Sequence, residues 1–222
     1  SASVASMVPL GFGGREIVEA KVEGLAPPPA GDASTECAHV GPEYATTMRI
    51  PLLRGRDVTD GDRAGAPPVA LVNEAFVKRY LTGREALGAQ LHFHRGPDET
   101  DADLPFAQAM TVVGVVENEM QGSDLGAPYK PMVYLNNLQL PRGSFFEELF
   151  NMAAQYAVRS NLPQDALAAE LRGVLRREAP SMVEMRLKPM SEGIEESLGQ
   201  RRLAMRMVGG FGVAALVLSA VG

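Results

Sequence analysis

The C-terminal end of the chain constrains the fold most strongly, because residues 207–222 form an uninterrupted apolar run. This run, MVGGFGVAALVLSAVG, contains no charge and no proline, and its most polar side chain is Ser219. As a helix it would span about 24 Å, which is short of the roughly 30 Å of a bilayer's hydrocarbon core. Because the run is still apolar where the sequence stops, we interpret it as a transmembrane helix that the end of the sequence truncates. The alternative is a buried C-terminal helix of a soluble protein.

Small residues within this run predict a packing surface for another membrane helix. Three glycines would each weaken a water-exposed helix by about 1 kcal/mol, yet glycine is common where membrane helices pack closely. Small residues also recur four positions apart, which places them on one helix face. The residues expected at this packing surface are Gly210, Ala214, Ala215 and Ser219.

A polar helix is expected directly before the apolar run. Ser191 is a candidate N-cap, and the acidic residues that follow it favour the positive N-terminal end of a helix. Arg202 and Arg206 lie four residues apart on one helix face, where like charges repel unless lipid phosphates or acidic partners accept them. Together with Arg201 they therefore suit a membrane surface.

The composition excludes some classes of partner. A net charge of -6 and a pI near 5.2 argue against a nucleic-acid surface, which needs clustered Lys and Arg. The 222 residues suffice for one large domain or two small ones. Cys37 is the only cysteine, so an internal disulfide is excluded. The sequence begins at Ser1 inside a strand-like pattern without a start Met, and we expect both ends to lie within a longer polypeptide.

The central part of the chain carries the clearest secondary-structure patterns. Val69 to Val72 predicts a covered strand, and Asn73 follows as the N-cap of a helix over NEAFVKRYL with Gly83 as its C-cap. The sequence TVVGVV at residues 111–116 is mostly β-branched and predicts a central strand. Further strands are predicted at residues 3–8, 17–22, 37–40, 90–94 and 131–135, a short helix at residues 42–48, and loops at residues 96–108 and 136–148.

The pattern changes after residue 150. Residues 152–159 predict a strand, and Pro163 opens a helix whose leucines lie at helical spacing up to Arg177. Residues 183–187 alternate as a second strand. This order of strand, helix and strand predicts a βαβ or split βαβ unit.

Two histidines form the candidate metal site. His92 and His94 lie two residues apart on one strand face, and imidazole is a common ligand of transition metals. The simpler interpretation is an exposed strand face that carries two histidines. The acidic residues at 98–103 lack the spacing and the glycine of a Ca²⁺ loop. We therefore predict no bound metal.

Other chemical motifs are incomplete. Gly11, Gly13 and Gly14 are not followed by the Lys-Ser/Thr pair and helix of a phosphate loop, so they predict a turn. His39 lies close to Cys37, but the sequence supplies no third catalytic partner. We therefore predict no cofactor and no enzymatic activity.

Several separated blocks of sequence follow one another in an order that is similar to that of a known protein family. RGRD at residues 54–57 precedes a short acidic turn, PVALVNE at 68–74 makes a strand-to-helix step, and Leu87-Gly88 begins the next strand. TVVGVV, PMVYL at residues 131–135 and the final stretch from Gln200 follow. In this order the blocks resemble MacB/FtsX-like ABC transporter permeases, in particular their large duplicated members, over nearly the whole chain.

The resemblance implies an α+β, two-lobed extracytoplasmic domain that leads into a truncated transmembrane helix. A porter-like lobe with a split βαβ unit would combine residues 1–38 and 149–190. An inserted mixed α/β, sabre-like lobe would span residues 39–148. Residues 191–222 would form a stalk helix and the truncated transmembrane helix. The domain would lie on the periplasmic side of the bacterial cytoplasmic (inner) membrane.

The sequence departs from the family pattern at a few loop positions. Glu43 and Ala45 stand where the family often has Gly and an aromatic residue, and Thr82 replaces a usual Pro. The stretch at residues 96–108 is longer than is typical. We expect these departures to change local loop geometry.

The leading functional hypothesis is a noncatalytic permease segment that transmits motion. A separate cytoplasmic ABC ATPase subunit would hydrolyse ATP, and the helix from Ser191 would pass the motion of the membrane helices to the outer domain. Pro189 and Gly199 are hinge candidates, since they suit a stiff helix least. Other implied partners are a second permease copy or internal duplicate half, the lipid bilayer and a periplasmic adaptor. The coupling residues expected are Pro189, Gly199, Arg201, Arg202 and Arg206.

Two hypotheses of other classes stay open. The first is a membrane-tethered module that binds a peptide, lipid or lipoprotein, or acts as a chaperone, without ATP coupling. The second is a soluble metal-dependent enzyme that uses His92 and His94. No residue specifies a transported substrate, since related permeases handle drugs, peptides and lipoproteins or only transmit force.

Overall fold

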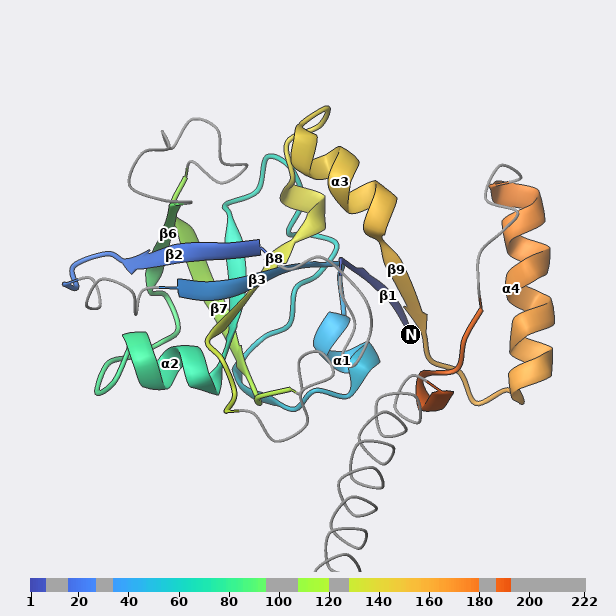
Figure 1. The fold of residues 1–222 in the computed structure, drawn as a ribbon, viewed down its shortest axis with the longest axis horizontal. Coiled ribbons are helices and arrows are strands. Elements are labelled where there is room, and N and C mark those ends of the chain that lie inside the picture. The colour runs from blue at the N-terminus through green and yellow to red at the C-terminus, as the bar shows by residue number, and fades with distance from the viewer. Residues whose placement is uncertain (7–15, 27–33, 95–107, 120–127, 180–186, 193–222) are drawn as a thin grey trace, which may run out of the picture. The chain divides into compact units, whose positions relative to one another are not determined.

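The computed structural model describes residues 1–6, 16–26, 34–94, 108–119, 128–179 and 187–192 (Figure 1). The chain falls into two compact units, Ser1–Arg159 and Ser160–Gly222. In chain order the described elements are β1 (Ala2–Ala5), β2 (Glu16–Val22), β3 (Ser34–Val40), α1 (Tyr44–Met48), β4 (Leu52–Gly55), β5 (Val69–Asn73), α2 (Glu74–Tyr80), β6 (Gln90–His94), β7 (Met110–Val116), β8 (Met132–Asn136), the 3₁₀ helix η2 (Asn137–Gln139), α3 (Phe145–Ala153), β9 (Gln155–Val158) and α4 (Gln164–Glu178).

The nine strands of the described residues join one sheet. Its order is β2-β6-β7-β5-β8-β3-β1-β9, with β4 paired to β7 and with a further pairing between β2 and β3. Because β2 pairs with both β6 and β3, the six strands from β2 to β3 in this order close into a ring. The β3–β8 and β5–β7 pairs are parallel, and the other pairs are antiparallel.

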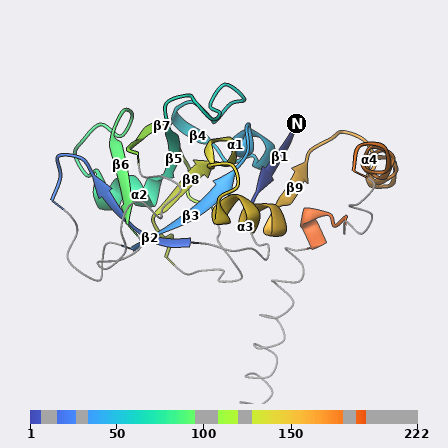
Figure 2. The same ribbon diagram turned by 90° about the horizontal axis from the view of Figure 1, so that it is seen from above.

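The central strands are buried on both faces. Alternate residues of β5 and β8 belong to two separate apolar clusters, one on each side of the sheet. One cluster includes Ala70, Val72, Val133, Leu135, Phe76 of α2 and Phe150 of α3. The other includes Val69, Leu71, Met132, Tyr134, Tyr44 of α1 and Val58. Thus α1 and α3 cover opposite faces (Figure 2). Burial on both sides explains the continuous apolar sequence of β7 and confirms the prediction of a central strand.

Asn73 ties three elements of this core together. It is the predicted N-cap of α2, and its Oδ1 accepts hydrogen bonds from Phe76 N at 2.9 Å and from Met132 N at 3.0 Å. Its Nδ2 donates to Lys130 O at 2.9 Å. This fully buried amide therefore joins the end of β5, the first turn of α2 and the start of β8.

The predicted loop at residues 136–148 is wrong in part, because η2 and the start of α3 lie within it. Ser144 is the N-cap of α3, and its Oγ accepts a hydrogen bond from Glu147 N at 3.2 Å. The Glu147 carboxylate accepts one from Gly143 N at 2.6 Å, close to the reciprocal pattern of a capping box. Since α3 continues to Ala153, the strand predicted from residue 152 begins at Gln155.

Three further boundaries differ from prediction. The strand β4 was not predicted, because all four of its residues are exposed and give no alternating pattern. The C-cap of α2 is Leu81, two residues before the predicted Gly83. In the second unit, helical conformation already begins at Met190, so Ser191 is inside the helix and is not its N-cap.

Other predicted elements agree or fall outside the description. The predicted strands at residues 17–22 and 90–94 and the predicted helix after Pro163 are confirmed. The turn at residues 11–14 and most of the strand at residues 183–187 lie outside the described residues, so the second strand of the βαβ unit stays a prediction. The division into two lobes also stays a prediction, although β2 and β3 of residues 1–38 share the sheet with strands of residues 39–148.

Candidate coupling site

The predicted hinge residue Pro189 lies immediately before a helix. Its carbonyl oxygen accepts a hydrogen bond from Glu192 N at 3.1 Å, and residues 190–192 are helical. Lys188 Nζ lies 3.7 Å from Glu192 Oε1, which forms an ion pair across the first turn. Pro189 therefore precedes the helix and does not interrupt it, a position where its missing N–H group costs little.

The other predicted coupling and packing residues lie outside the described residues. Among the described helices, none is both long and apolar enough to cross a membrane, and the apolar run at residues 207–222 is beyond them. The residues in question are Gly199, Arg201, Arg202, Arg206, Gly210, Ala214, Ala215 and Ser219.

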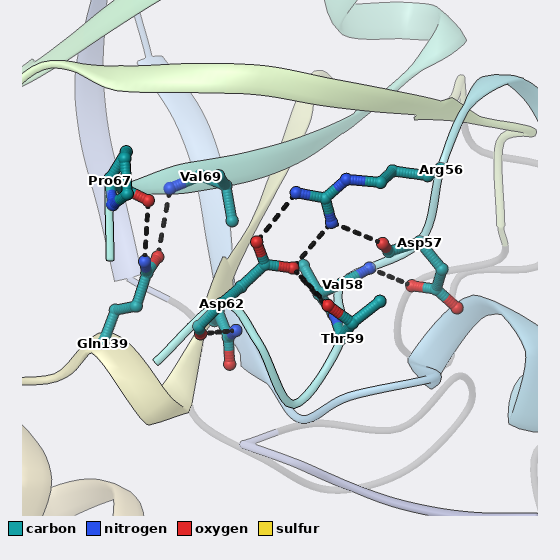
Figure 3. A network of polar contacts seen from close by, with 9 residues as sticks. Arg56, Asp57, Val58, Thr59, Asp62, Pro67, Val69 and Gln139 are labelled. Carbon is teal, nitrogen blue, oxygen red and sulfur yellow. Dashed lines mark hydrogen bonds and ion pairs between the residues drawn. The ribbon is translucent and has the colours of Figure 1, made fainter. Parts of the chain in front are cut away.

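The 56–62 loop, which follows β4, contains a network of hydrogen bonds and an ion pair (Figure 3). Arg56 Nη1 and Nη2 donate to the two carboxylate oxygens of Asp62 at 2.6 and 2.7 Å, a bidentate ion pair. Asp62 Oδ2 also accepts hydrogen bonds from Thr59 N and Thr59 Oγ1, both at 2.9 Å. The carboxylate is almost fully buried while the guanidinium is half-exposed. These bonds close the loop upon itself.

The C-terminal end of the 56–62 loop is hydrogen-bonded to β8, and η2 is hydrogen-bonded to the start of β5 nearby. Asn136 Nδ2 donates to the backbone oxygen of Asp62. Nearby, Gln139 Oε1 accepts from Val69 N at 3.0 Å, and its Nε2 donates to Pro67 O at 2.9 Å (Figure 3). The side chain of Gln139 thus takes the place of a neighbouring strand at the start of β5.

Asp57 connects the 56–62 loop to α1. Its Oδ2 accepts hydrogen bonds from Thr46 N at 3.1 Å and from Thr46 Oγ1 at 3.3 Å, while its Oδ1 accepts from Val58 N at 2.8 Å. Val58 O accepts a hydrogen bond from Glu43 N at 2.9 Å. Glu43 has a φ of 56°, in the left-handed region that favours glycine.

The ion pair makes Asp62 a pH-sensitive contributor to stability. Hydrogen bonds from Arg56 hold the pKa of Asp62 below its ordinary value; burial opposes this, and the bonds from Thr59 add to it. Because the pKa is lower in the folded chain than in the unfolded chain, the stabilisation is complete above about pH 4 and is lost as pH falls through the folded value.

We expect Asp62→Asn to lower the free energy of unfolding by about 1 to 2 kcal/mol near neutral pH, since the half-exposed partner limits the effect. The deficit should shrink as the pH falls below about 4, where the wild-type carboxylate becomes protonated. Urea unfolding between pH 3 and pH 7 measures this. Asp60→Asn, a change of the exposed carboxylate two residues away, is the matched control and should be nearly neutral. A deficit that does not depend on pH would contradict the assignment.

The buried carboxylate of Glu119 interacts with two tyrosines, Tyr134 of β8 and Tyr44 of α1. Tyr134 Oη donates to Glu119 Oε1 at 2.9 Å, and the rings of Tyr44 and Tyr134 lie 5.7 Å apart. Burial raises the pKa of Tyr44 well above its ordinary value, and the charge of Glu119 and a hydrogen bond to it act in the same direction. Tyr44 therefore stays protonated and serves as a packed, hydrogen-bonding member of the core.

The candidate metal and catalytic residues do not form a common site in the part of the chain that the structure describes. His92 Nε2 on β6 lies 4.0 Å from Oε2 of Glu23, the residue after β2, and both side chains are partly exposed; no group of three metal-ligating side chains occurs among the described residues. His39 and Cys37 are buried on β3, and the His39 ring packs edge-on against Phe150 at 6.2 Å. The glycines at residues 11–14 and the acidic residues at 98–103 lie outside the described residues.

Sequence reasoning missed the pairings that order the first unit. It noted the RGRD block and the acidic turn, but the Arg56–Asp62 pair and the link from Asp57 to α1 depend on how the chain turns after β4. It also gave no role to Arg159, whose Nε donates to Thr47 O at 2.7 Å across 112 positions. No local pattern indicates such a contact.

The sheet with helices on both faces defines a mixed α/β domain, and comparisons place it in a family. The chain matches the family model of the MacB-like periplasmic core domain over residues 3–174, and it belongs to this family. The predicted resemblance to MacB-like ABC transporter permeases and the mixed α/β extracytoplasmic fold are thereby confirmed. No curated protein matches the chain.

Three solved structures resemble this chain. The periplasmic region of MacB from Actinobacillus actinomycetemcomitans is 13% identical, with a TM-score of 0.49 over 80% of this chain and 66% of that one. A domain assigned to a permease protein from Porphyromonas gingivalis is 15% identical, with a TM-score of 0.50 over 85% of this chain and 78% of that one. The extracellular domain of the ABC-type transporter YknZ from Gram-positive bacteria is 11% identical, with a TM-score of 0.46 over 80% of this chain and 74% of that one. At these identities the likeness concerns the fold only.

Proposed function

We propose that this domain is a noncatalytic, motion-transmitting part of an ABC transporter permease in the bacterial cytoplasmic membrane. Its membership of the MacB-like periplasmic core domain family is the observation that carries the proposal. ATP hydrolysis by a separate cytoplasmic subunit would move the membrane helices. The helix that begins at Met190 would pass that motion to the periplasmic domain, for efflux or other work outside the membrane.

The start of this helix supports a transmitting role. Pro189 sets the direction in which the chain enters the helix, because its ring fixes one backbone angle. The ion pair between Lys188 and Glu192 spans the first turn, so the helix is stabilised where it leaves the domain. A helix transmits displacement along its axis since its backbone bonds are satisfied internally.

The partners proposed follow from the same family membership. They are the cytoplasmic ABC ATPase subunit, a second permease copy or an internal duplicate half, the lipid bilayer around residues 207–222, and a periplasmic adaptor. In this arrangement Gly199 and the arginines at 201, 202 and 206 would lie where the stalk meets the membrane. The glycine-containing face with Gly210 would pack on a neighbouring membrane helix.

Insertion of a flexible Gly/Ser segment after Leu198 tests the coupling in the full permease with its ATPase subunit. We expect transport to be lost while ATP hydrolysis continues, because the inserted segment absorbs the displacement of the stalk. Transport is measured with drugs, peptides and lipoproteins, the substrate classes of related permeases. The matched control is the same insertion after Gly83, in the exposed turn that follows α2.

The outcomes separate the proposal from its main alternative. Unaltered transport together with intact ATP hydrolysis would contradict transmission through this helix. A domain that binds a peptide or lipoprotein with equal affinity in the presence and absence of the ATPase subunit would instead favour a membrane-tethered binding or chaperone module.

A further inference from the structure

Arg159 occupies a distinctive position, because it is the last residue of the first unit and is held there at three points. Its backbone N–H donates to Ser1 O at 2.9 Å, and its carbonyl oxygen accepts from Ser1 N at 3.2 Å. Its side chain leaves the sheet edge, and Nε donates to Thr47 O in α1 at 2.7 Å. Along the chain, the second unit begins at the residue that follows Arg159.

Arg159 contacts α1 at its C-terminal end, where a helix interacts favourably with positive charge. Thr47 lies in the last turn of this five-residue helix, where carbonyl oxygens lack helical partners and carry partial negative charge. A guanidinium N–H donated to such a carbonyl is a charge-assisted hydrogen bond, stronger than one between neutral groups. Tyr44, Ala45 and Thr47 of α1 are buried, so the helix is packed against the core.

From α1 the bonded path continues into the 56–62 loop. Thr46, adjacent to Thr47, donates two hydrogen bonds to Asp57. Arg56 Nη1 donates to Asp57 O at 3.0 Å and, together with Nη2, holds Asp62. The path therefore runs from Arg159 through α1 to a loop whose residues 59, 60 and 61 are exposed. A second route reaches the same loop through the pairing of β9 with β1, β1 with β3 and β3 with β8, whose Asn136 donates to Asp62 O.

We infer that Arg159 is the positioning residue that passes displacement of the second unit to α1 and the 56–62 loop, an inference that rests on the proposed motion-transmitting function. The contact between the Arg159 guanidinium and Thr47 O makes α1 follow the junction between the units. Loss of the guanidinium would leave the strand pairing with Ser1 and the bond from Asn136 to the loop intact, and would remove the bonded route from Arg159 through α1. The inferred coupling through α1 thus depends on one side chain.

Hydrogen exchange in the full permease with its ATPase subunit, in lipid nanodiscs, tests this inference. Exchange is compared without nucleotide and with a non-hydrolysable ATP analogue, for one peptide over residues 57–64 and one over residues 187–198. The amides of Val58, Thr59 and Asp62 are hydrogen-bonded within the loop, so their exchange reports on its closure. In the wild type we expect both peptides to respond to the nucleotide.

Arg159→Met should reduce the nucleotide response of the loop peptide by about fivefold or more and leave that of the stalk peptide unchanged. Arg159→Lys should keep the response, because its ammonium group can still donate to Thr47 O. Arg142→Met, which removes an exposed arginine of the same unit, is the control for lost charge and should keep both responses. If Arg159→Met does not fold, Arg159→Leu provides the same loss of the side-chain donor.

Each outcome decides a separate claim. An unchanged loop response in the Arg159→Met or Arg159→Leu variant overturns the inference, as does a wild-type loop that does not respond to the nucleotide while the stalk responds. Both of these results leave the proposed function standing. A wild-type stalk peptide that does not respond to the nucleotide overturns the proposed function itself, and the inference with it.

Discussion

Replacement of Gly114 by alanine is expected to cost the chain about 3 kcal/mol of its free energy of unfolding, because β4 and β7 approach each other too closely for a side chain. A Cβ atom at Gly114 would overlap the carbonyl oxygen of Arg56 and would lie 2.8 Å from Leu71 Cδ2. The opposite residue in the β4–β7 register is Gly55, which has a φ of 76° and an equally crowded environment. Relief would require a shift of the backbone that leads into the 56–62 loop.

Gly61→Ala is the matched control for this prediction. Gly61 lies in the same unit, and a Cβ there would meet only Thr59 Oγ1 at an ordinary contact distance of 3.6 Å. Its effect should stay within about 0.5 kcal/mol. Urea unfolding of both variants, followed by circular dichroism, measures the difference. Equal midpoints for the two variants would show that the close approach of β4 and β7 does not stabilise the fold.

Asn73→Ala should also cost about 3 kcal/mol, because three backbone groups, two of them buried, lose this amide as a partner at once. Phe76 N loses its cap, Met132 N loses an acceptor and Lys130 O loses a donor. Asn73→Asp should also be destabilising although it retains the two acceptor contacts, since it buries a charge and turns a carboxylate oxygen toward Lys130 O. The midpoint of denaturant unfolding measures both variants.

Ser144→Ala separates the capping contribution of Asn73 from its contacts with β8. Ser144 is also a helix N-cap, but its side chain accepts one hydrogen bond, from Glu147 N at the edge of the core. Loss of such a cap costs about 1 kcal/mol. An Asn73→Ala variant that is no less stable than Ser144→Ala would mean that the bonds to the start of β8 contribute nothing.

Features determined by neighbouring residues could be predicted from the sequence. The N-cap at Asn73 and the strand at residues 111–116 follow from local side-chain chemistry and from burial on both faces. The helix α3 was predictable in principle, because Ser144 and Glu147 have the spacing of a capping box. The strand β4 was not, since an exposed edge strand needs no alternation of apolar and polar residues.

The candidate site depends on contacts between distant parts of the chain, and these could not be predicted. The resemblance identified the family, and the family match confirms it. The Arg56–Asp62 pair requires the turn after β4, and the Arg159–Thr47 contact joins residues 112 positions apart. A sequence pattern states which residues are charged or apolar, but it does not state which carbonyl a given guanidinium will reach.

Cysteine labelling tests most directly the central claim that this is an extracytoplasmic domain of a membrane permease. Within residues 1–222 Cys37 is the one cysteine, and it is buried, so a Cys37→Ser, Asp60→Cys variant in which every cysteine outside these residues is also replaced by serine carries a single exposed thiol. The full permease is treated with a membrane-impermeant maleimide in intact spheroplasts and after disruption of the membrane. The account predicts equal labelling at residue 60 in both samples, and no labelling of the same cysteine-free permease that retains Asp60. Labelling that requires disruption of the membrane would contradict it.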